Sequence, residues 1–211
     1  MKYRAVIFDL DGVICHTDKY HYQAWKTIAD KLNIYFDEKI NHRLRGVSRM
    51  ESFNIILENY DDLMTNEDKA AYVEEKNQIY KDLLRSMSPE DLSEEVKNTL
   101  LELRNRGLKL AIGSSSKNAK YILSRISLSD FFDAISDGNN ITKSKPDPEV
   151  FLMAAEYLKL PAENCLVVED AVAGIEAAKA GGMDCCAIGD AVSGNIATFN
   201  LKAFKDLLMI P

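Results

Sequence analysis

The sequence predicts an α/β fold, in which helices flank a parallel sheet and a helical domain is inserted after the first strand. From about residue 89 onward, short apolar runs alternate with helical stretches, which is the pattern of successive strand–helix–strand units. The apolar run AVIFD near the N-terminus has the same texture. Residues 17–87, which come next, are helical in pattern with almost no strand signal. The simplest account is therefore a sheet domain interrupted by an insert.

The elements follow from short runs taken in chain order. Strands are expected at AVIFD, LKLAIG, DAIS, CLVVED and DCCAIG, which are residues 5–9, 108–113, 133–136, 165–170 and 184–189. Helices are expected between them at KNAKYILSRI, PEVFLMAAEYL and AGIEAAKAG, which are residues 117–126, 148–158 and 173–181. Ligands of such sheets bind outside the carboxyl ends of the strands. That edge is where functional residues are expected.

The totals restrict the class of protein. The chain has 211 residues, of which 46% are apolar, enough for one large domain or two small ones. Its net charge of −7 argues against a surface that wraps nucleic acid. The four cysteines, Cys15, Cys165, Cys185 and Cys186, show no CxxC spacing and are expected to be reduced. No apolar run is long enough for a membrane span and the N-terminus lacks a signal-peptide shape, so we expect a cytoplasmic location.

Two carboxylates stand at the end of the first strand. Asp9 and Asp11 are two residues apart and would point the same way, which is costly unless a cation or a shared proton offsets their repulsion. Glu169 and Asp170 end another strand. Four acids at one sheet edge would form a hard-oxygen site suited to Mg²⁺. The alternative is that each acid is an ordinary turn or helix N-cap residue.

Two other polar loops are expected at the same edge. In GSSSKN a strand ends, hydroxyls follow, and a helix begins, so Ser114, Ser115 and Lys117 could bind a phosphate group. The alternative is a serine-rich N-cap with Ser116 capping. Lys145 lies in the loop KSKPDP, where a lone lysine is usually only solvated. Its interest depends on the groups around it.

The inserted segment carries further candidates. His21 and Trp25 lie on one helical stripe, where a histidine is more often a satisfied core residue than a ligand. Ser48 with Glu51 predicts a capping box, and hence a helix that begins beside Arg49. Lys76 falls on an apolar helical face. It either extends outward to solvent or faces a cleft between the domains.

Four motifs together resemble the haloacid-dehalogenase superfamily of phosphotransferases. They are DLDGV, AIGSSSKN, the lysine of SKPDPEVF, and VVEDAVAGIEAAKAGG, in this order. The insert resembles the helical cap of subclass I. The resemblance implies a Rossmann-like core formed by residues 1–16 and 88–211, with a helical cap domain at residues 17–87.

Within the superfamily the chain is most similar to the β-phosphoglucomutases. The segments responsible are FDLDGV, YHYQAWK, LRGVSRMESF, EEKNQIY, SSSKNA and SKPDPEVF. Three departures put substrate preference in question more than chemistry. Arg45 stands where lysine is usual, Ala171 stands where serine is common, and the chain after Gly189 is short and divergent.

This resemblance implies a role for each matching residue. Asp9 would be the nucleophile and Asp11 the general acid and base, while Ser114 and Lys145 would neutralise the phosphoryl oxygens. Mg²⁺ would be held by Asp9, the Asp11 carbonyl oxygen, Glu169 and Asp170. Thr17 would lie in the hinge. The substrate-binding residues would be His21, Trp25, Arg45, Gly46, Val47, Ser48, Arg49, Ser52, Lys76, Ser115, Ser116, Lys117 and Asn118.

The implied activity is isomerisation of β-glucose 1-phosphate and glucose 6-phosphate through a phospho-aspartate, with glucose 1,6-bisphosphate as intermediate and activator. The implied partners are small sugar phosphates, without nucleic acid or membrane, and the chain is expected to be a monomer. One alternative is a Mg²⁺-dependent sugar-phosphate phosphatase with the same catalytic motifs. Another is a non-catalytic sugar-phosphate sensor, which the intact acids Asp9 and Asp11 disfavour.

Overall fold

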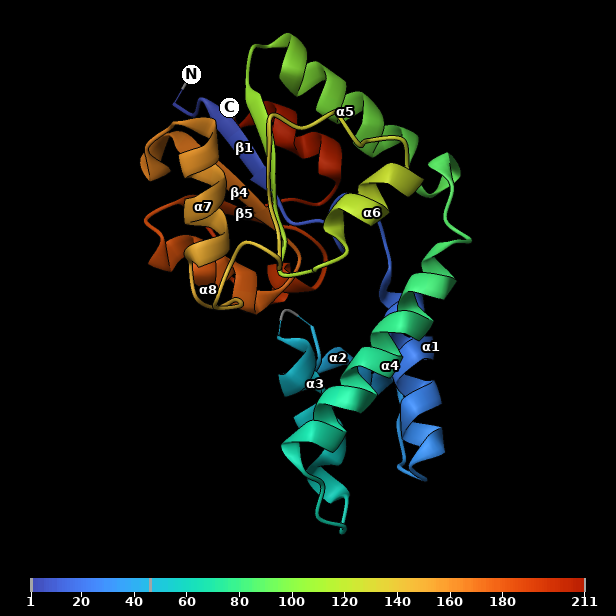
Figure 1. Ribbon diagram of the computed structural model, residues 1–211. Helices are drawn as coiled ribbons and strands as arrows, with labels where there is room; N and C mark the ends of the chain where they lie inside the picture. Colours follow the sequence, from blue (N-terminus) through green and yellow to red (C-terminus); the bar gives the residue numbers. More distant parts are fainter. Residues whose placement is uncertain (1, 46, 211) are drawn as a thin grey trace.

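The computed structural model describes residues 2–45 and 47–210. Six parallel strands form one sheet in the order β3-β2-β1-β4-β5-β6 (Figure 1). Their bounds are β1 Ala5–Phe8, β2 Lys109–Gly113, β3 Ala134–Ser136, β4 Cys165–Glu169, β5 Asp184–Ala187 and β6 Phe199–Asn200. The expected class, a Rossmann-like α/β fold, is confirmed.

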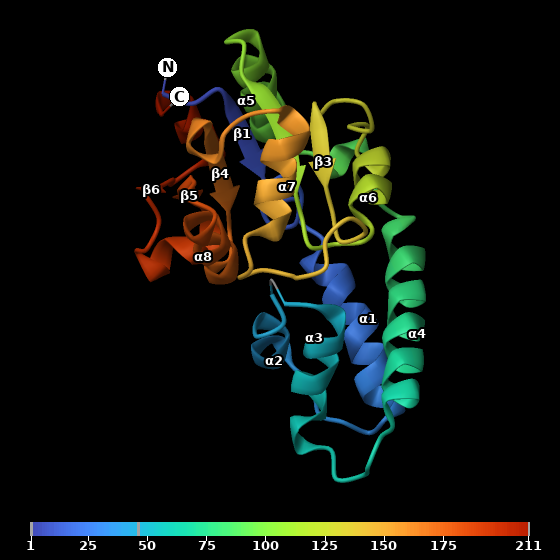
Figure 2. The same cartoon turned by 60° about the vertical axis from the view of Figure 1, so that its left-hand side comes forward.

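Both faces of the sheet are buried, which explains why its central strands read as continuous apolar runs. Successive side chains of β1 point to opposite faces, so that Val6 and Phe8 join one core and Ala5 and Ile7 the other. The first face is covered by α5 (Glu94–Asn105) and α6 (Ala119–Arg125). The second is covered by α7 (Glu149–Leu158) and α8 (Val172–Ala180). The carboxyl ends of the strands face the remaining helices (Figure 2).

The sequence did not predict β6. It pairs with β5 through only two residues, Phe199 and Asn200, too few to show an alternating pattern. The 3₁₀ turns Gly189–Gly194 and Phe204–Met209 flank it, and the second of these packs against α5. The divergent C-terminal segment thus completes the edge of the sheet and one of its layers.

The inserted segment forms a helical unit of α1 (Asp18–Lys31), α2 (Glu38–His42), α3 (Arg49–Ile56) and α4 (Asn66–Leu84). Figures 1 and 2 both show α1 and α4 side by side, with α2 and α3 next to them. The unit has a hydrophobic core of its own around Trp25, Ile28 and Phe53. This core of its own lets the inserted segment fold as a separate helical layer opposite the edge of the sheet.

The helical unit joins the sheet domain where α1 begins and α4 ends. There Tyr20, Tyr80, Leu84 and Met87 pack within the core of the first sheet face. Arg125 of α6 donates to the carbonyl oxygen of Met87 at 2.7 Å. The expected domain boundaries, after residues 16 and 87, stay a prediction. Within the residues described, no helix is both long and apolar enough to cross a membrane.

Candidate active site

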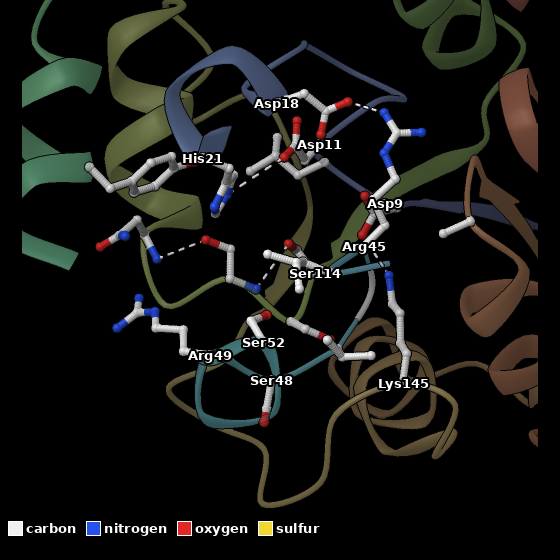
Figure 3. A pocket seen from close by; sticks show the side chains of 18 of the residues that line it. Asp9, Asp11, Asp18, His21, Arg45, Ser48, Arg49, Ser52, Ser114 and Lys145 are labelled. Atoms are coloured by element: carbon white, nitrogen blue, oxygen red, sulfur yellow. Dashed lines mark hydrogen bonds and ion pairs between the residues drawn. The ribbon is translucent and has the colours of Figure 1, made fainter. Parts of the chain in front are cut away.

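A pocket lies between the carboxyl ends of the strands and the helical unit (Figure 3). Residues that directly follow β1 and β2, the end of β4 with the residues after it, and the loop before α7 line its sheet side. Residues from α1, α2, α3, α4 and the loop between α2 and α3 line its other side. Nearly all the site residues expected from the sequence line this pocket: Asp9, Asp11, His21, Trp25, Arg45, Val47, Ser48, Arg49, Ser52, Lys76, Ser114, Ser115, Ser116, Asn118, Lys145, Glu169 and Asp170. Among the described residues that were expected, Lys117 does not appear in this lining.

Three buried carboxyl groups meet beneath the pocket. Oxygen atoms of Asp9, Glu169 and Asp170 lie within 4.8 Å of one another. Lys145 Nζ donates to Asp9 Oδ1 at 2.5 Å and to Glu169 Oε1 at 2.6 Å. The loop lysine of the sequence is therefore only 4% exposed, and it compensates part of the charge of the acids.

The carboxyl pKa values reflect this crowding. Burial raises the pKa of Asp9 to about 7, and Glu169 adds to the rise although Lys145 opposes it. Burial, followed by the charges of Asp9 and Glu169, raises the pKa of Asp170 to about 8. Burial alone lowers the pKa of Lys145, but its two carboxylate partners outweigh that effect and hold it above the ordinary value. An additional cation would relieve the repulsion among the acids.

Two glycines create the space that the acids need. A Cβ built on Gly12 would lie 2.0 Å from Asp170 Oδ2, and Gly12 also has a φ of +88°. A Cβ on Gly174, in α8, would lie 1.9 Å from Glu169 Oε1. Any side chain at either position would displace a carboxylate. The glycines of DLDGV and of the AVAGIEAA segment are thus steric requirements of the acid cluster.

Asp11 stands apart from the three clustered acids. Its Oδ1 accepts a hydrogen bond from the Thr17 backbone N–H at 2.7 Å, and Tyr80 in turn donates to the Thr17 hydroxyl at 2.9 Å. Burial raises the pKa of Asp11, although the bonds from Thr17 oppose the rise. The carboxyl group of Asp11 is therefore held against the start of α1, where the helical unit begins.

The serine loop after β2 forms the next part of the wall. Ser114 is buried, and its Oγ accepts from the Ser116 N–H at 3.2 Å; Ser116 Oγ likewise accepts from the Asn118 N–H at 3.2 Å. Asn118 then donates across the cleft to Asn77 Oδ1 of α4 at 3.1 Å. Asn77 was not among the residues singled out from the sequence, because nothing local marks it as facing another domain.

Lys117 is the exception in this loop. Its side chain is exposed and packs against Gly138, while its carbonyl oxygen accepts from Asn139 Nδ2 at 3.0 Å. Lys117 does not line the pocket. The expectation that Lys117 binds substrate therefore has no support from its placement here and stays a prediction.

His21 and Lys76 face each other across the helical side of the pocket. Lys76 Nζ and His21 Nδ1 are hydrogen-bonded at 2.8 Å, and His21 Nε2 lies 3.7 Å from Asp11 Oδ2. Lys76 is 1% exposed, with its ammonium 4.8 Å from the ring centroids of both Trp25 and Tyr80. Burial, aided by Arg49, lowers the pKa of Lys76 to about 7. Burial and then Lys76 lower the pKa of His21 well below its ordinary value.

The start of α3 supplies the remaining polar groups. Ser48 Oγ accepts from the Glu51 N–H at 3.2 Å, which confirms the helix start predicted at Ser48. The return bond from the Glu51 side chain to the Ser48 N–H is not formed, so the predicted capping box is only half present. Arg49 begins the helix, and among the described residues no carboxylate lies within salt-bridge distance of it. Val47, Ser48 and the buried Ser52 line the pocket beside it. Gly46, expected here as a substrate-binding residue, lies outside the described residues.

Arg45 makes contacts that the sequence did not predict. Its guanidinium pairs with Asp18 of α1, lies 2.5 Å from Asp190 Oδ2 and lies 3.7 Å from Asp170 Oδ2. Asp190 comes after the carboxyl end of β5, so the rule that ligands gather at that edge would have drawn attention to it. Asp18 was not singled out from the sequence, because an acidic residue at a helix start is ordinary.

The donor set of the acid cluster fits a hard divalent cation such as Mg²⁺, because carboxylate oxygens are its preferred protein ligands. Asp9, Glu169 and Asp170 are the residues that would hold it. The side chain of Asp11 is not part of that group. The contribution expected from its carbonyl oxygen stays a prediction.

Comparison with known proteins places this site in a family. Residues 3–182 match the haloacid dehalogenase-like hydrolases. The chain belongs to that family. It is 43% identical to the β-phosphoglucomutase of Bacillus subtilis over 188 residues, which cover 88% of this chain and 83% of that protein. It is 30% identical to a phosphorylated carbohydrates phosphatase of Thermotoga maritima over 184 residues, 85% of this chain and 82% of the relative.

The fold of this haloacid dehalogenase-like chain also matches a solved relative. The crystal structure of the β-phosphoglucomutase from Clostridium difficile superposes with a TM-score of 0.91 at 37% identity, covering 97% of this chain and 93% of that one. The resemblance inferred from the sequence motifs is therefore confirmed. So is the expectation that the chain is an enzyme of the β-phosphoglucomutase-like kind.

Proposed function

We propose that this protein is a β-phosphoglucomutase that interconverts β-glucose 1-phosphate and glucose 6-phosphate through glucose 1,6-bisphosphate. One observation carries the proposal. The same pocket is lined by the acid cluster, whose Asp9 and Glu169 pair with Lys145, and by two basic side chains, Arg49 and Lys76. Among the described residues, neither of these two basic side chains pairs with a carboxylate. A sugar with a phosphate at each end needs both kinds of group. The similarity to two β-phosphoglucomutases supports the same assignment.

Asp9 is the proposed nucleophile. One of its oxygens attacks a phosphate of the bisphosphate, so that an O–P bond to Asp9 forms as the bond to the sugar oxygen breaks. Asp11, whose pKa is raised by burial, donates a proton to the departing oxygen. The monophosphate leaves and β-glucose 1-phosphate binds. Asp11 takes the proton of its 6-hydroxyl as the O–P bond to Asp9 breaks and the phosphoryl group passes to that oxygen. The bisphosphate so formed turns, its 1-phosphoryl group passes to Asp9, and glucose 6-phosphate is released.

The transferring phosphoryl group is anionic and needs donors at its equatorial oxygens. Ser114 and Lys145 lie beside Asp9 and can supply them. Mg²⁺ bound by Asp9, Glu169 and Asp170 would shield the charge between nucleophile and phosphate. Arg49, with Ser116 and Asn118 across the cleft, is the proposed seat of the second phosphate. His21 and Lys76 would contact the sugar hydroxyls between the two ends.

The competing function is hydrolysis of a sugar phosphate, the activity named for the Thermotoga relative. The two activities share Asp9 and Asp11 and differ in whether water or a sugar hydroxyl accepts the phosphoryl group. The buried position of Lys76, beside the partly exposed His21 and close to Asp11, favours the mutase because a bound sugar would displace water there. A cytoplasmic monomer, with a cap domain at residues 17–87, completes the proposal.

³¹P NMR of the purified protein tests it. With Mg²⁺, β-glucose 1-phosphate and a trace of glucose 1,6-bisphosphate, we expect glucose 6-phosphate with little free phosphate. Omitting the bisphosphate should delay or abolish the reaction, because Asp9 must first be phosphorylated. Steady release of inorganic phosphate without isomerisation would assign the chain to the phosphatases instead.

A further inference from the structure

Besides the approach of His21 to Asp11, two sets of contacts join the helical unit to the sheet domain across the pocket. One lies close to the junction, where Asn118 of the sheet domain meets Asn77 of α4 at 3.1 Å. The other lies below α8, at the ends of α2 and α3, away from the upper ends of α1 and α4 (Figure 2). This second set consists of Arg45, His42, Asp170 and Asp190. The proposed mechanism does not use Asp190.

Two of these contacts are made to the carboxylate of Asp190. Its Oδ2 lies 2.5 Å from Arg45 Nη1 and 3.1 Å from His42 Nε2, so that two side chains of the helical unit reach one oxygen of the sheet domain. Asp190 itself does not line the pocket. Its place beside the acid cluster is fixed through the backbone, because the Ala191 N–H donates to the Asp170 carbonyl oxygen at 2.9 Å.

The position of Arg45 matters to the pocket because the next residues of the chain form one of its walls. Val47, Ser48 and Arg49 come two to four residues later and line the pocket wall opposite the acids. The other guanidinium nitrogen of Arg45 pairs with Asp18 at the start of α1. Arg45 therefore links the beginning of the helical unit, the wall that carries Arg49, and the sheet domain through Asp190.

We propose that Asp190 is a positioning residue: by holding Arg45 it keeps the helical unit closed over Asp9, and so favours the sugar hydroxyl over water as phosphoryl acceptor. The proposal rests on the proposed function for its second half. In the wasteful reaction a water oxygen bonds to phosphorus, the O–P bond to Asp9 breaks, and Asp11 takes the water proton. Loosening the closure admits the water that this reaction needs.

The partition between the two acceptors is the first readout. ³¹P NMR measures inorganic phosphate released per glucose 6-phosphate formed. Asp190→Asn keeps the shape and removes the charge, and we expect it to raise this ratio about two- to fivefold, the range for a partly exposed ion pair. Asp190→Glu should return the ratio toward wild type. Asp130→Asn removes an exposed carboxylate of the sheet domain, outside the pocket, and should leave the ratio unchanged.

The second readout does not depend on activity. Spin labels at Asp62→Cys in the helical unit and Glu156→Cys in α7 report the separation of the two parts, since both sites are exposed and all four native cysteines are buried. In the unliganded protein with Mg²⁺ we expect one dominant short distance. Asp190→Asn should enlarge the population at longer distances about two- to fivefold, and Asp130→Asn should not.

The outcomes separate the two proposals. If wild type forms no glucose 6-phosphate, the proposed function fails, and the distance measurement still decides whether Asp190 holds the closure. Distances that are the same in Asp190→Asn and Asp130→Asn overturn the closure role. A longer distance with an unchanged product ratio overturns the link from closure to acceptor choice.

Discussion

The sheet side of the pocket is buried and densely paired, whereas the helical side is more exposed and partly unpaired. Glu169, Ser114 and Lys145 are between 1% and 4% exposed, and short hydrogen bonds fix them to their neighbours. On the helical side, Ser48 is exposed and Arg49 is half-buried without a carboxylate partner among the described residues. Under the proposed function, phosphoryl chemistry belongs to the buried, paired side and recognition of the rest of the substrate to the more exposed side.

The sharpest test of the sheet side is Asp9→Asn, which keeps the shape and removes the nucleophile. We expect turnover to fall by at least about 10³-fold, because Asp9 is the group that carries the phosphoryl group in the proposed mechanism. Glucose 6-phosphate formation by ³¹P NMR measures the loss, and Asp130→Asn serves as the exposed control. Substantial turnover in Asp9→Asn would place the phospho-enzyme on another residue.

Metal binding tests the sheet side without catalysis. We expect Asp170→Asn to weaken Mg²⁺ binding about 10- to 100-fold, because it removes one of three clustered carboxylates. Isothermal titration of the protein with MgCl₂ gives the affinity directly. Asp147→Asn, which lies outside the cluster, is the matched control. Equal affinities in the two variants would remove Asp170 from the metal site.

The helical side is tested by Arg49→Lys, which keeps the charge and loses the planar fork. We expect the KM for β-glucose 1-phosphate to rise about tenfold, since bidentate contact with the second phosphate is lost. Phosphorylation of Asp9 by acetyl phosphate, which has no second phosphate, should change little. Arg43→Lys, exposed and paired with Glu58, is the control. An equal loss with both phosphoryl donors would contradict the division between the two sides.

The smallest effect concerns stability and the buried ammonium of Lys76. Its pKa is about 7 in the folded protein and about 10.5 when unfolded. Between these values the unfolded state binds the additional proton, so the free energy of unfolding rises with pH over this range and is lowest below pH 7. Lys76→Met should therefore stabilise the protein by about 1 kcal/mol at pH 6, with the gain fading toward pH 10.

Thermal unfolding of Lys76→Met and wild type from pH 6 to pH 10 measures this dependence. The exposed Lys81→Met, on the same helix, should show no such trend. A gain for Lys76→Met that does not depend on pH would mean that Lys76 is hydrated in the folded protein.

Most strands of the sheet domain were predictable because short apolar runs in the sequence indicate which segments are buried strands. The acids, Ser114 and Lys145 each come after an apolar run, and parallel strands bring such ends together whatever lies between them. The N-cap at Ser48 needed only the four residues around it. Local rules therefore predicted five strands in their places and most of the pocket lining.

The contacts across the cleft were not predictable in this way. Asp190 and Arg45 are 145 residues apart, and their pairing depends on how two domains meet. The same applies to Asn77 and Asn118, whose side chains are ordinary in their own helices. The contact of Lys117 with Gly138, a residue on another loop, was not predictable from local sequence either. The hypothesis that Lys76 faces the cleft needed the structure to separate it from an outward-pointing side chain.

The absence of side chains at Gly12 and Gly174 has a consequence for how sequences of this kind tolerate change. Because the carboxylates of Asp170 and Glu169 occupy the volume that a methyl group would fill, alanine at either position acts like a mutation of the acid it touches. A saturation scan scored by growth or turnover would therefore rank these two uncharged, non-reacting positions with the charged residues. Some of the motif residues in such a chain, such as Gly12 and Gly174, are therefore required for the room they leave to a neighbouring carboxylate and not for any chemistry of their own.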